Sequence, residues 1–357
     1  MTSTKAIFIN LIFILLILLL LFGSSFLKDT WFKSKEVKEK VISGEAFGVE
    51  TYKITIVTNE KEQELERFKK DVLDPFLKTF NQEFSTYISD SYITKLNQAE
   101  LNVSFPTSEY FDVAFEESLW ANQETDGAFD PSIGSLINLW GFGEKKQDPN
   151  DVSEDAIKEA KSQIGLDAFD WKKGSIKKKR KVTLNLSSVV EGYAVDLVAK
   201  LLEKEGYKNY LIDIGGENLA KGNKANGTPF VIGLEIPRDM NQLEDRKYQY
   251  KIQLKDSSVA TSGNYKQFYI QNGKRYSHII DPVSGYPAQN NLACATVICK
   301  DCMRADTLST AFMVMGFEKS LLYANKHPEI DAIFTIRNKE NEFVSVMSVG
   351  FKKHLIK

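Results

Sequence analysis

A carboxylate and a hydroxyl are spaced for metal binding in the segment MRADTLSTAFMVMG, residues 303–316. Asp306 and Thr310 are four residues apart, so a helix would place both side chains on one face. Carboxylate and hydroxyl oxygens are hard ligands that suit Mg²⁺. A helical threonine can instead bond the backbone carbonyl one turn earlier, so the spacing alone leaves both interpretations open.

One histidine lies where it can move a proton. His278 belongs to YSHIIDPVSGYP, residues 276–287, in which DPVSG is a turn signal. An imidazole close to an aspartate can act as a general base near neutral pH, although a lone histidine is more often structural. Only three histidines occur in 357 residues, which argues against a multi-histidine metal site.

Two further segments are rich in residues that bring the backbone close to a ligand. TDGAFDPSIGSLINLWGFG, residues 125–143, combines Asp-Gly, Asp-Pro and further glycines, and a structural loop has the same composition. SSVVEGYAVD, residues 187–196, lies at a predicted strand-to-helix junction. There Ser188 and Glu191 fit a capping box, while Gly192 would let a phosphate approach the amides of the helix start. The spacing does not choose between these interpretations.

The cysteines give weaker signals. Cys299 and Cys302 form a Cys-x-x-Cys pair with no second pair and no histidine nearby, which argues against tetrahedral zinc. A local disulfide is an alternative in an exported protein, and Cys294 is expected to be buried. A thiol redox or metal protein built on this pair is therefore a minor hypothesis.

The first 27 residues are expected to enter a membrane. No charged residue lies between Lys5 and Lys28, and residues 11–22 are nearly all aliphatic. About 20 apolar residues span a bilayer as a helix, so we expect a retained anchor. A cleaved signal peptide is the alternative, because small residues follow the apolar run. Either way, the rest of the chain is expected to be exported or tethered to a membrane.

Strands and helices that must position these residues alternate from about residue 45. After a linker at 28–44, we expect one α+β catalytic domain over residues 45–357. Period-two alternation and turn glycines predict strands at 51–58, 182–186, 209–216, 295–300 and 330–336, with a β-rich region over 229–280. Apolar residues at helical spacing predict helices over 65–80, 111–119, 153–165 and 194–202, and from about 303.

Charge and composition exclude some classes of protein. Hydrophobic residues make up 43% and charged residues 26%, as in globular proteins. The 46 basic and 48 acidic residues nearly balance, which argues against a nucleic-acid-binding protein. The basic stretch KKGSIKKKRK, residues 172–181, predicts a solvated hairpin around Gly174 and Ser175, or alternatively a contact with anionic lipid.

Four separated segments, in this order, resemble those of the ApbE-type flavin transferases (FAD:protein FMN transferases). They are GAFDPSIGSLINLWGFG, EGYAVD, SGNYKQF with YSHIIDPVSGYP, and ADTLSTAFMVMG, and the resemblance covers roughly residues 44–350. Phe47-Gly48-Val49 stands where the family usually has Met-Gly-Thr, and Glu191 stands where many members have lysine.

The resemblance implies an α+β, T-fold-like body of two lobes, with mixed β-sheets, flanking helices and flavin held between the lobes. Enzymes of this family join the FMN half of FAD, through a phosphoester, to a Thr or Ser of a target flavoprotein and release AMP. Mg²⁺ would be bound by Asp306, Thr310 and the backbone carbonyl of Ala194, and His278 would be the general base. The FAD site would be lined by Phe47, Tyr87, Ala128, Phe129, Asp130, Glu191 and Ile280.

The resemblance also bears on location and on competing activities. It implies a domain on the outer, periplasmic side of a bacterial inner membrane, acting on membrane-linked redox subunits or exported flavoproteins. Hydrolysis of FAD to FMN and AMP is an alternative, because the nucleophile is not part of this chain. A non-catalytic, membrane-tethered FAD-binding protein is a third hypothesis, and the presence of Asp306 and His278 argues against it.

Overall fold

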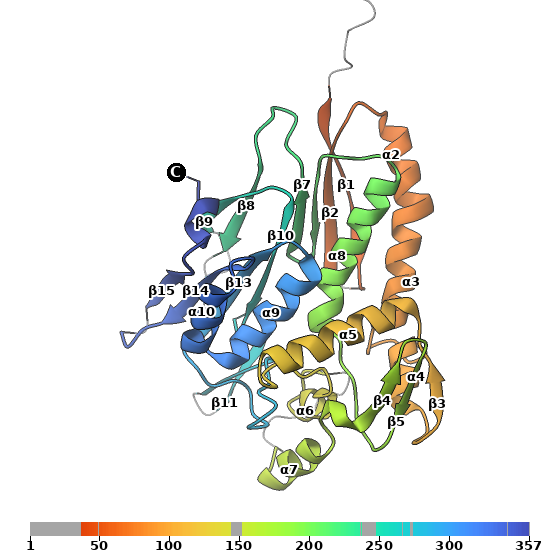
Figure 1. Cartoon of the computed structure of the whole chain (residues 1–357), viewed down its shortest axis with the longest axis vertical. Helices are drawn as coiled ribbons and strands as arrows, with labels where there is room; N and C mark the ends of the chain where they lie inside the picture. Colours follow the sequence, from red (N-terminus) through yellow and green to blue (C-terminus); the bar gives the residue numbers. More distant parts are fainter. Residues whose placement is uncertain are drawn as a thin grey trace, which may run out of the picture. The chain divides into compact units, whose positions relative to one another are not determined.

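An antiparallel β-sheet of eight strands organises the described residues (Figure 1). Its strands lie in the order β1 (Lys38–Ala46), β2 (Glu50–Thr58), β6 (Tyr210–Ile214), β7 (Glu217–Lys221), β10 (Ser257–Gly263), β13 (Leu292–Cys299), β14 (Asp331–Arg337) and β15 (Phe343–Met347). All the ladders from β2 to β15 are antiparallel. The mixed pairing implied by the resemblance is therefore wrong for the ladders from β2 to β15. One of these ladders follows from a tight turn: Gly215 and Gly216, both with positive φ (65° and 109°), connect β6 directly to its neighbour β7.

The computed structural model describes residues 37–48, 50–143, 152–235, 237, 248–265, 267–271, 274–340 and 342–356. From Glu39 onward the chain forms one unit, so contacts do not separate the two lobes implied by the resemblance. Strand β1 begins at Lys38, and residues 38–44 of the predicted linker therefore belong to the sheet. The membrane segment predicted at 1–27 lies outside the described residues. Within the described ranges, no helix is long and apolar enough to cross a membrane.

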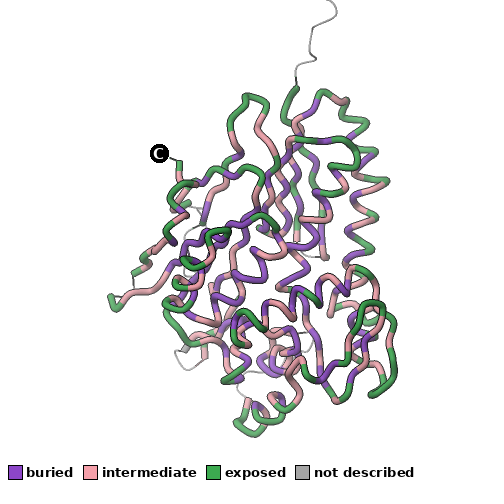
Figure 2. Tube along the Cα trace, in the orientation of Figure 1, coloured by how far each residue is buried: buried purple, intermediate pink, exposed green. Residues whose placement is uncertain are grey.

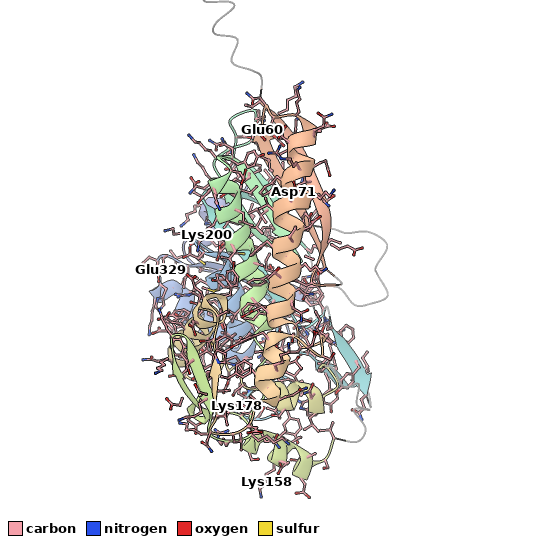
Figure 3. All side chains as sticks on the ribbon, turned by 90° about the vertical axis from the view of Figure 1, so that its right-hand side faces the viewer. Glu60, Asp71, Lys158, Lys178, Lys200 and Glu329 are labelled. Atoms are coloured by element: carbon pink, nitrogen blue, oxygen red, sulfur yellow. The ribbon has the colours of Figure 1, made fainter. Side chains whose placement is uncertain are left out.

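Helices and small sheets surround the large sheet. The helices are α2 (Glu62–Phe68), α3 (Asp74–Phe84), α4 (Tyr92–Gln98), α5 (Glu109–Glu124), α6 (Gly134–Leu139), α7 (Glu154–Ser162), α8 (Ser187–Lys204), α9 (Cys302–Met315) and α10 (Phe317–Lys326). The small sheets contain β3 (Ser104–Pro106), β5 (Ser175–Lys178) and β4 (Phe169–Lys172); β8 (Phe230–Glu235) and β9 (Tyr248–Leu254); and β11 (Phe268–Gln271) and β12 (Lys274–Ser277). A π-helical turn that contains Asp71 joins α2 to α3, and together they run along one side of the body (Figure 3).

The central strands of the large sheet are buried on both faces, since their successive side chains point to opposite sides and both sets are buried. On one face, Val297 and Phe334 join a cluster with side chains of α9 and α10. On the other, their chain neighbours Ile298 and Ile333 pack with the β8–β9 hairpin and Phe351. Strand β13 is accordingly buried along its whole length, in the inner part of the body (Figure 2). This burial makes β10 and β13 a firm support for α9.

Most predicted elements are confirmed. The alternating segment 51–58 forms β2, and the helix predicted at 194–202 is the central part of α8. Ser153 caps α7 as its position predicts, because its side chain accepts the backbone N–H of Ala156 at 3.2 Å. The basic stretch forms the β4–β5 hairpin, which turns at Gly174.

The strand predicted at residues 182–186 is wrong. Val182 and Leu184 are buried as the alternation predicts, but in this segment only Thr183 pairs as in a sheet, through a single parallel bridge to Ile133. The side chain of Asn97 bonds the backbone of this segment instead. It accepts the N–H of Leu184 at 2.8 Å and donates to the Leu184 carbonyl at 2.9 Å. An amide side chain thus replaces a neighbouring strand, which alternation cannot reveal.

All three cysteines are buried thiols, and no disulfide links Cys299 to Cys302. The Cys299 thiol donates to the carbonyl of Asp301, and the Cys302 thiol donates to the carbonyl of Asn218. Burial raises the pKa of Cys299 to about 12 and the pKa of Cys302 well above its usual range. Reactive cysteines need a lowered thiol pKa and access to solvent, so nothing here supports the thiol redox hypothesis.

Candidate active site

The centre of the candidate site is the contact between α8 and α9, which lie side by side against the sheet (Figure 1). The backbone N–H of Gly192 on α8 donates to Oδ2 of Asp306 on α9 at 3.0 Å. A Cβ atom at Gly192 would lie 2.4 Å from the carbonyl oxygen of Cys302 and 2.8 Å from Asp306 Cβ. Glycine is therefore required for this close approach of two backbones. The Asp306 carboxylate, only 6% exposed, is held in one orientation by that amide.

Hydroxyl groups surround the next turn of α9. Ser262, near the end of β10, places its Oγ 2.9 Å from Thr310 Oγ1 and 2.8 Å from Ser309 Oγ. Ser309 in turn donates to the carbonyl of Asp306 at 2.9 Å. The Thr310 hydroxyl thus has a side-chain partner on β10, whereas Thr307 makes the bond to a carbonyl one turn back, at 2.8 Å to Met303.

The donor set predicted for a metal fits Mg²⁺ by its chemistry. Asp306 supplies a carboxylate oxygen and Thr310 a hydroxyl oxygen, both on one side of α9. Ala194, fully buried on α8 half a turn beyond Gly192, is predicted to offer the third, carbonyl oxygen. Within the described residues no group of three or more His, Cys, Asp or Glu could hold a metal ion. Any metal at this site therefore depends on neutral oxygen atoms beside the one carboxylate.

His278 follows β12 and contacts the backbone carbonyl of Gln267 through two of its nitrogen atoms. Both its Nδ1 and its backbone nitrogen lie 3.2 Å from the carbonyl oxygen of Gln267. A carbonyl only accepts hydrogen bonds, so this contact favours the tautomer with hydrogen on Nδ1 and the basic lone pair on Nε2. The ring of Phe142 contacts the imidazole in an edge-to-face arrangement, with 6.3 Å between ring centres. The histidine is therefore oriented by two elements that lie far apart in the sequence.

A column of stacked rings joins the glycine-rich segment to the histidine segment. Trp140 stacks on Tyr276, Tyr276 on Tyr269, and Tyr269 on Phe142, with ring centres 5.5, 5.5 and 5.4 Å apart. The indole N–H of Trp140 also donates to the carbonyl of Gly285 at 2.8 Å, in the turn after His278. Two segments that the sequence singled out separately thus form one structural block.

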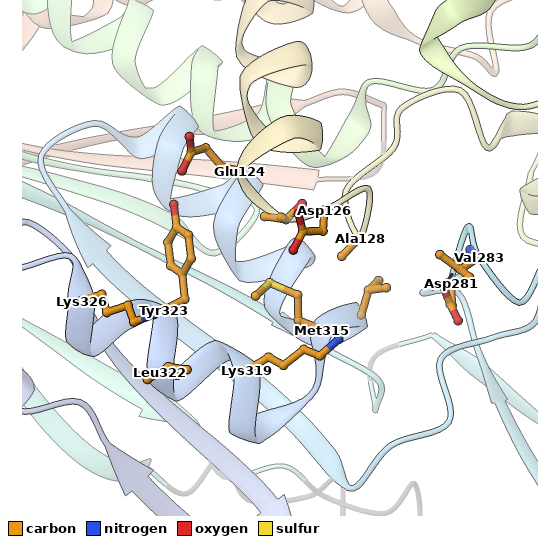
Figure 4. Close-up of a pocket in the computed structure, with 12 residues that line it drawn as sticks. Glu124, Asp126, Ala128, Asp281, Val283, Met315, Lys319, Leu322, Tyr323 and Lys326 are labelled. Atoms are coloured by element: carbon orange, nitrogen blue, oxygen red, sulfur yellow. Dashed lines mark hydrogen bonds between the residues drawn. The ribbon is translucent and has the colours of Figure 1, made fainter.

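A pocket of about 450 Å³ lies between the end of α5, the end of α9, α10 and the turn at Asp281 (Figure 4). Its volume is in the range of small-molecule sites. Of the residues predicted to line the FAD site, Ala128 alone borders it. Lys319 and Lys326 contribute positive charges opposite the carboxylates of Asp126 and Asp281 (Figure 4). The pocket therefore adjoins the glycine-rich loop but is not the whole predicted FAD site.

The other residues predicted to line the FAD site fall into two groups. Tyr87 is 70% exposed, and its hydroxyl donates to the carbonyl of Phe142 at 3.4 Å, beside the ring that contacts His278. Phe47 adopts positive φ (55°) in the turn after β1 and packs on Phe80, with ring centres 6.2 Å apart. These two aromatic side chains remain partly or largely open. Glu191 is also only partly buried, on the first turns of α8.

Three predicted lining residues have structural contacts instead. Phe129 is 5% exposed and Ile280 is 2% exposed, so their side chains belong to the core. Asp130 accepts the backbone N–H and the hydroxyl of Ser132, at 2.8 and 2.5 Å, and burial raises its pKa. The Ser132 hydroxyl in turn accepts the N–H of Gly165 at 2.6 Å. These residues shape the loop, and a ligand would meet their backbone more readily than their side chains.

The capping box predicted for Ser188 and Glu191 is wrong. Helix α8 begins at Ser187, and its preceding residue Leu186 makes no side-chain cap. Instead, the side chain of Asn185 accepts the backbone N–H and the hydroxyl of Ser187, at 3.0 and 2.7 Å. The helix starts two residues earlier than the motif suggests, so Ser188 is not the N-cap and the capping box does not form.

A model of the ApbE family matches residues 50–334 of this chain. The chain belongs to the ApbE family. A Haemophilus influenzae protein named FAD:protein FMN transferase is 34% identical to it over 333 residues, which are 89% of this chain and 92% of that protein. A Vibrio cholerae protein of the same name is 31% identical, over 90% of this chain and 95% of that protein.

Solved structures agree with this ApbE assignment. The flavin transferase ApbE from Vibrio cholerae superposes with a TM-score of 0.79 at 31% identity, over 89% of this chain and all of that one. The apo form of the flavinyl transferase ApbE from Pseudomonas stutzeri gives a TM-score of 0.78 at 32% identity, over 89% of this chain and 97% of that one. The α+β architecture around the large sheet is thus shared with ApbE enzymes.

Sequence reasoning missed three residues of this ApbE site. Ser262 contacts Thr310, Asp196 bonds the start of α9, and Arg304 ties α9 to α5. The one signal available was that Asp196 follows Gly192 by four residues, on the same face of a predicted helix. Ser262 and Arg304 meet their partners only through the tertiary fold.

Arg304, which is partly exposed, forms a clamp between α9 and the buried Glu117 of α5. Its Nε and Nη2 atoms donate to the two oxygens of Glu117, at 2.5 and 2.8 Å, and Glu117 is 6% exposed. The guanidinium also lies 3.3 Å from the ring centre of Trp120. Because Arg304 is two residues before Asp306, this clamp helps to fix the first turns of α9.

We expect Arg304→Lys to lower the free energy of unfolding by about 1–3 kcal/mol, because lysine leaves one buried oxygen of Glu117 without its donor. Chemical denaturation measures the change. The matched control is Lys173→Ala, which removes the partner of Glu116 on the same helix in an exposed pair, 70% and 56% exposed. An exposed pair contributes about 0–1 kcal/mol. Equal effects of the two substitutions would contradict the clamp.

Gly192→Ala should lower the free energy of unfolding by about 1–3 kcal/mol, since the added methyl group meets backbone atoms of α9. Denaturant titration of the full-length protein measures this change, and Lys200→Ala, an exposed substitution on the same helix, is the control. If Gly192→Ala left the denaturation midpoint unchanged, α8 and α9 could move apart to accommodate the methyl group without a loss of stability.

Proposed function

We propose that this chain transfers the FMN half of FAD to a Thr or Ser hydroxyl of a target flavoprotein, in a Mg²⁺-dependent reaction that releases AMP. The observation that carries the proposal is the 34% identity, over 89% of this chain, to a protein named FAD:protein FMN transferase. The oxygen donors at the α8–α9 contact and the orientation of His278 support it, because the reaction needs charge stabilisation and a base.

The transfer exchanges one phosphorus–oxygen bond for another. The acceptor hydroxyl oxygen bonds to the FMN phosphorus, the bond from that phosphorus to the bridging pyrophosphate oxygen breaks, and AMP leaves with the bridging oxygen. His278 takes the hydroxyl proton at Nε2. The Gln267 carbonyl keeps hydrogen on Nδ1 and so maintains Nε2 as the base.

The α8–α9 contact would hold the metal and prepare its ligands. Asp306, Thr310 and the carbonyl of Ala194 are the proposed ligands, with Asp306 oriented by the amide of Gly192 and Thr310 by Ser262. Mg²⁺ bound there would neutralise negative charge on the diphosphate of FAD. Since only one ligand is charged, the site would depend strongly on the exact placement of the neutral oxygens.

The FAD site would extend from this contact over the predicted lining residues. Tyr87 and Phe47 offer aromatic surface to flavin or adenine, and Glu191 offers a carboxylate on α8. The loop from Ala128 to Asp130 would contribute backbone groups, as would Ile280. The proposal also places residues 1–27 in a bacterial inner membrane and the body on its outer side, which the long uncharged run in that segment supports.

The test mixes the full-length protein with FAD, Mg²⁺ and a candidate acceptor that carries a Thr or Ser. The proposal predicts an acceptor heavier by one FMN less one water, equimolar AMP, and loss of both products when the metal is chelated. AMP and free FMN without acceptor labelling, across several acceptors, would favour FAD hydrolysis. FAD binding without AMP would overturn both enzymatic activities.

A further inference from the structure

Asp196 bonds the start of α9 from a neighbouring helix. It lies on α8, and its carboxylate accepts the N–H of Cys302 through Oδ1 and the N–H of Met303 through Oδ2, both at 2.9 Å. These are the first two residues of α9. The residue before them, Asp301, makes no side-chain cap of its own. The first amides of α9 therefore find their acceptor on α8.

This arrangement differs in effect from an ordinary helix cap. The first amides of a helix have no partner within the helix, and a carboxylate there is favoured by hydrogen bonding and by the helix dipole. A local cap fixes the helix end to its own preceding chain. Asp196 instead fixes the end of α9 to α8, and two bonds from one carboxylate restrict both sliding and rotation.

A second contact lies one turn away on both helices. Gly192 is four residues before Asp196 on α8, and its N–H bonds Asp306, four residues after Cys302 on α9. The two contacts bracket Ala194, which lies between them on α8. Together they set the position of α9 against the stretch of α8 that carries the Ala194 carbonyl.

We propose that Asp196 is a positioning residue for the metal site: by capping α9 from α8, it sets the distance between the Ala194 carbonyl and the Asp306 carboxylate. This inference rests on the metal site of the proposed function and deepens it. Asp196 does not itself bind the ion. Its removal should weaken metal binding by more than any general loss of stability accounts for.

The test compares Asp196 with a second aspartate that accepts several hydrogen bonds. Asp112 on α5 also accepts several hydrogen bonds, from Thr107, Trp171 and Gly174 at 2.7, 2.9 and 2.7 Å, but it joins α5 to the small sheet. Asp112→Asn is therefore matched in chemistry, and its hydrogen bonds do not join α8 to α9. Asp196→Asn and Asp112→Asn are made in the full-length protein, and thermal unfolding shows the stability cost of each.

The decisive readout is binding of Mn²⁺ alone, measured without FAD by the electron paramagnetic resonance signal of the free ion. The expected result is a Kd raised about 10- to 100-fold by Asp196→Asn, as for residues that orient metal ligands, and left within about twofold of wild type by Asp112→Asn. Saturating Mg²⁺ should also restore the transfer rate of Asp196→Asn. Wild-type Mn²⁺ binding in Asp196→Asn would overturn the inference.

Two further outcomes are separable. If Asp196→Asn does not fold, Asp196→Glu keeps both carboxylate oxygens but moves them by one methylene, and it should still raise the Kd for Mn²⁺ while Asp112→Glu does not. An unchanged Kd in Asp196→Glu would then overturn the inference.

The wild-type protein separates this inference from the proposed function. If it transfers flavin but binds no Mn²⁺, the metal assignment itself is overturned. If it binds Mn²⁺ without transferring flavin, the proposed reaction is overturned and the positioning role stays supported.

Discussion

His278→Gly is expected to lower flavin transfer by about 10²- to 10⁴-fold, the usual contribution of a general base, while FAD still binds. The residue is held through the Gln267 carbonyl and the ring of Phe142, and its own removal leaves the metal ligands on α8 and α9 in place. Transfer is measured by the mass gain of the acceptor, and FAD binding by quenching of flavin fluorescence.

His327→Gly is the matched control for this substitution. His327 is another histidine, at the end of α10, where it stacks on Tyr323 with ring centres 4.2 Å apart. It has no part in the proposed reaction, so its substitution should leave the transfer rate near wild type. A wild-type rate in His278→Gly would show that another group accepts the hydroxyl proton.

Asp306→Asn is expected to lower transfer by about 10²- to 10³-fold at a fixed Mg²⁺ concentration, comparable to loss of one preorganised electrostatic contact. The amide removes the only charge of the proposed ligand set. An asparagine oxygen can still accept the N–H of Gly192, so the fold should persist. The measurement is the initial rate against Mg²⁺ concentration, with Mn²⁺ binding measured in parallel.

The control for Asp306→Asn lies at the start of the same helix. Asp301 is exposed, makes no cap bond through its side chain, and is outside the proposed ligand set. Asp301→Asn should therefore keep both the rate and its Mg²⁺ dependence. If Asp306→Asn responded to Mg²⁺ as the wild type does, the ion would have to bind elsewhere.

Local patterns in the sequence predicted the elements that carry the site. The apolar stripe of α8 and the alternation of β2 are properties of neighbouring residues, so both could be predicted without the fold. The same holds for Asp306 and Thr310, whose spacing alone places them on one face of α9. The spacing did not decide whether the Thr310 hydroxyl bonds its own helix backbone or points outward. The contact with Ser262 on β10 shows that it points outward.

Two failed predictions depend on asparagine side chains whose roles the sequence pattern does not reveal. Residues 182–186 alternate like a strand, but Asn97 takes the place of the neighbouring strand. Ser188 and Glu191 fit a capping box, but the helix begins earlier and the side chain of Asn185 accepts the N–H of Ser187. Hydrogen-bond partners of single polar side chains are set by tertiary contacts, and periodicity carries no information about them.

The buried thiols have a consequence for the environments in which the chain can work. Oxidation and thiol exchange proceed through exposed thiolates, and Cys299 and Cys302 are protonated and shielded from solvent. With Cys294 buried as well, no cysteine is available for pairing with another chain or for capture by an oxidant. The folded protein therefore presents no thiol that an oxidant could readily convert, and no disulfide holds its fold together.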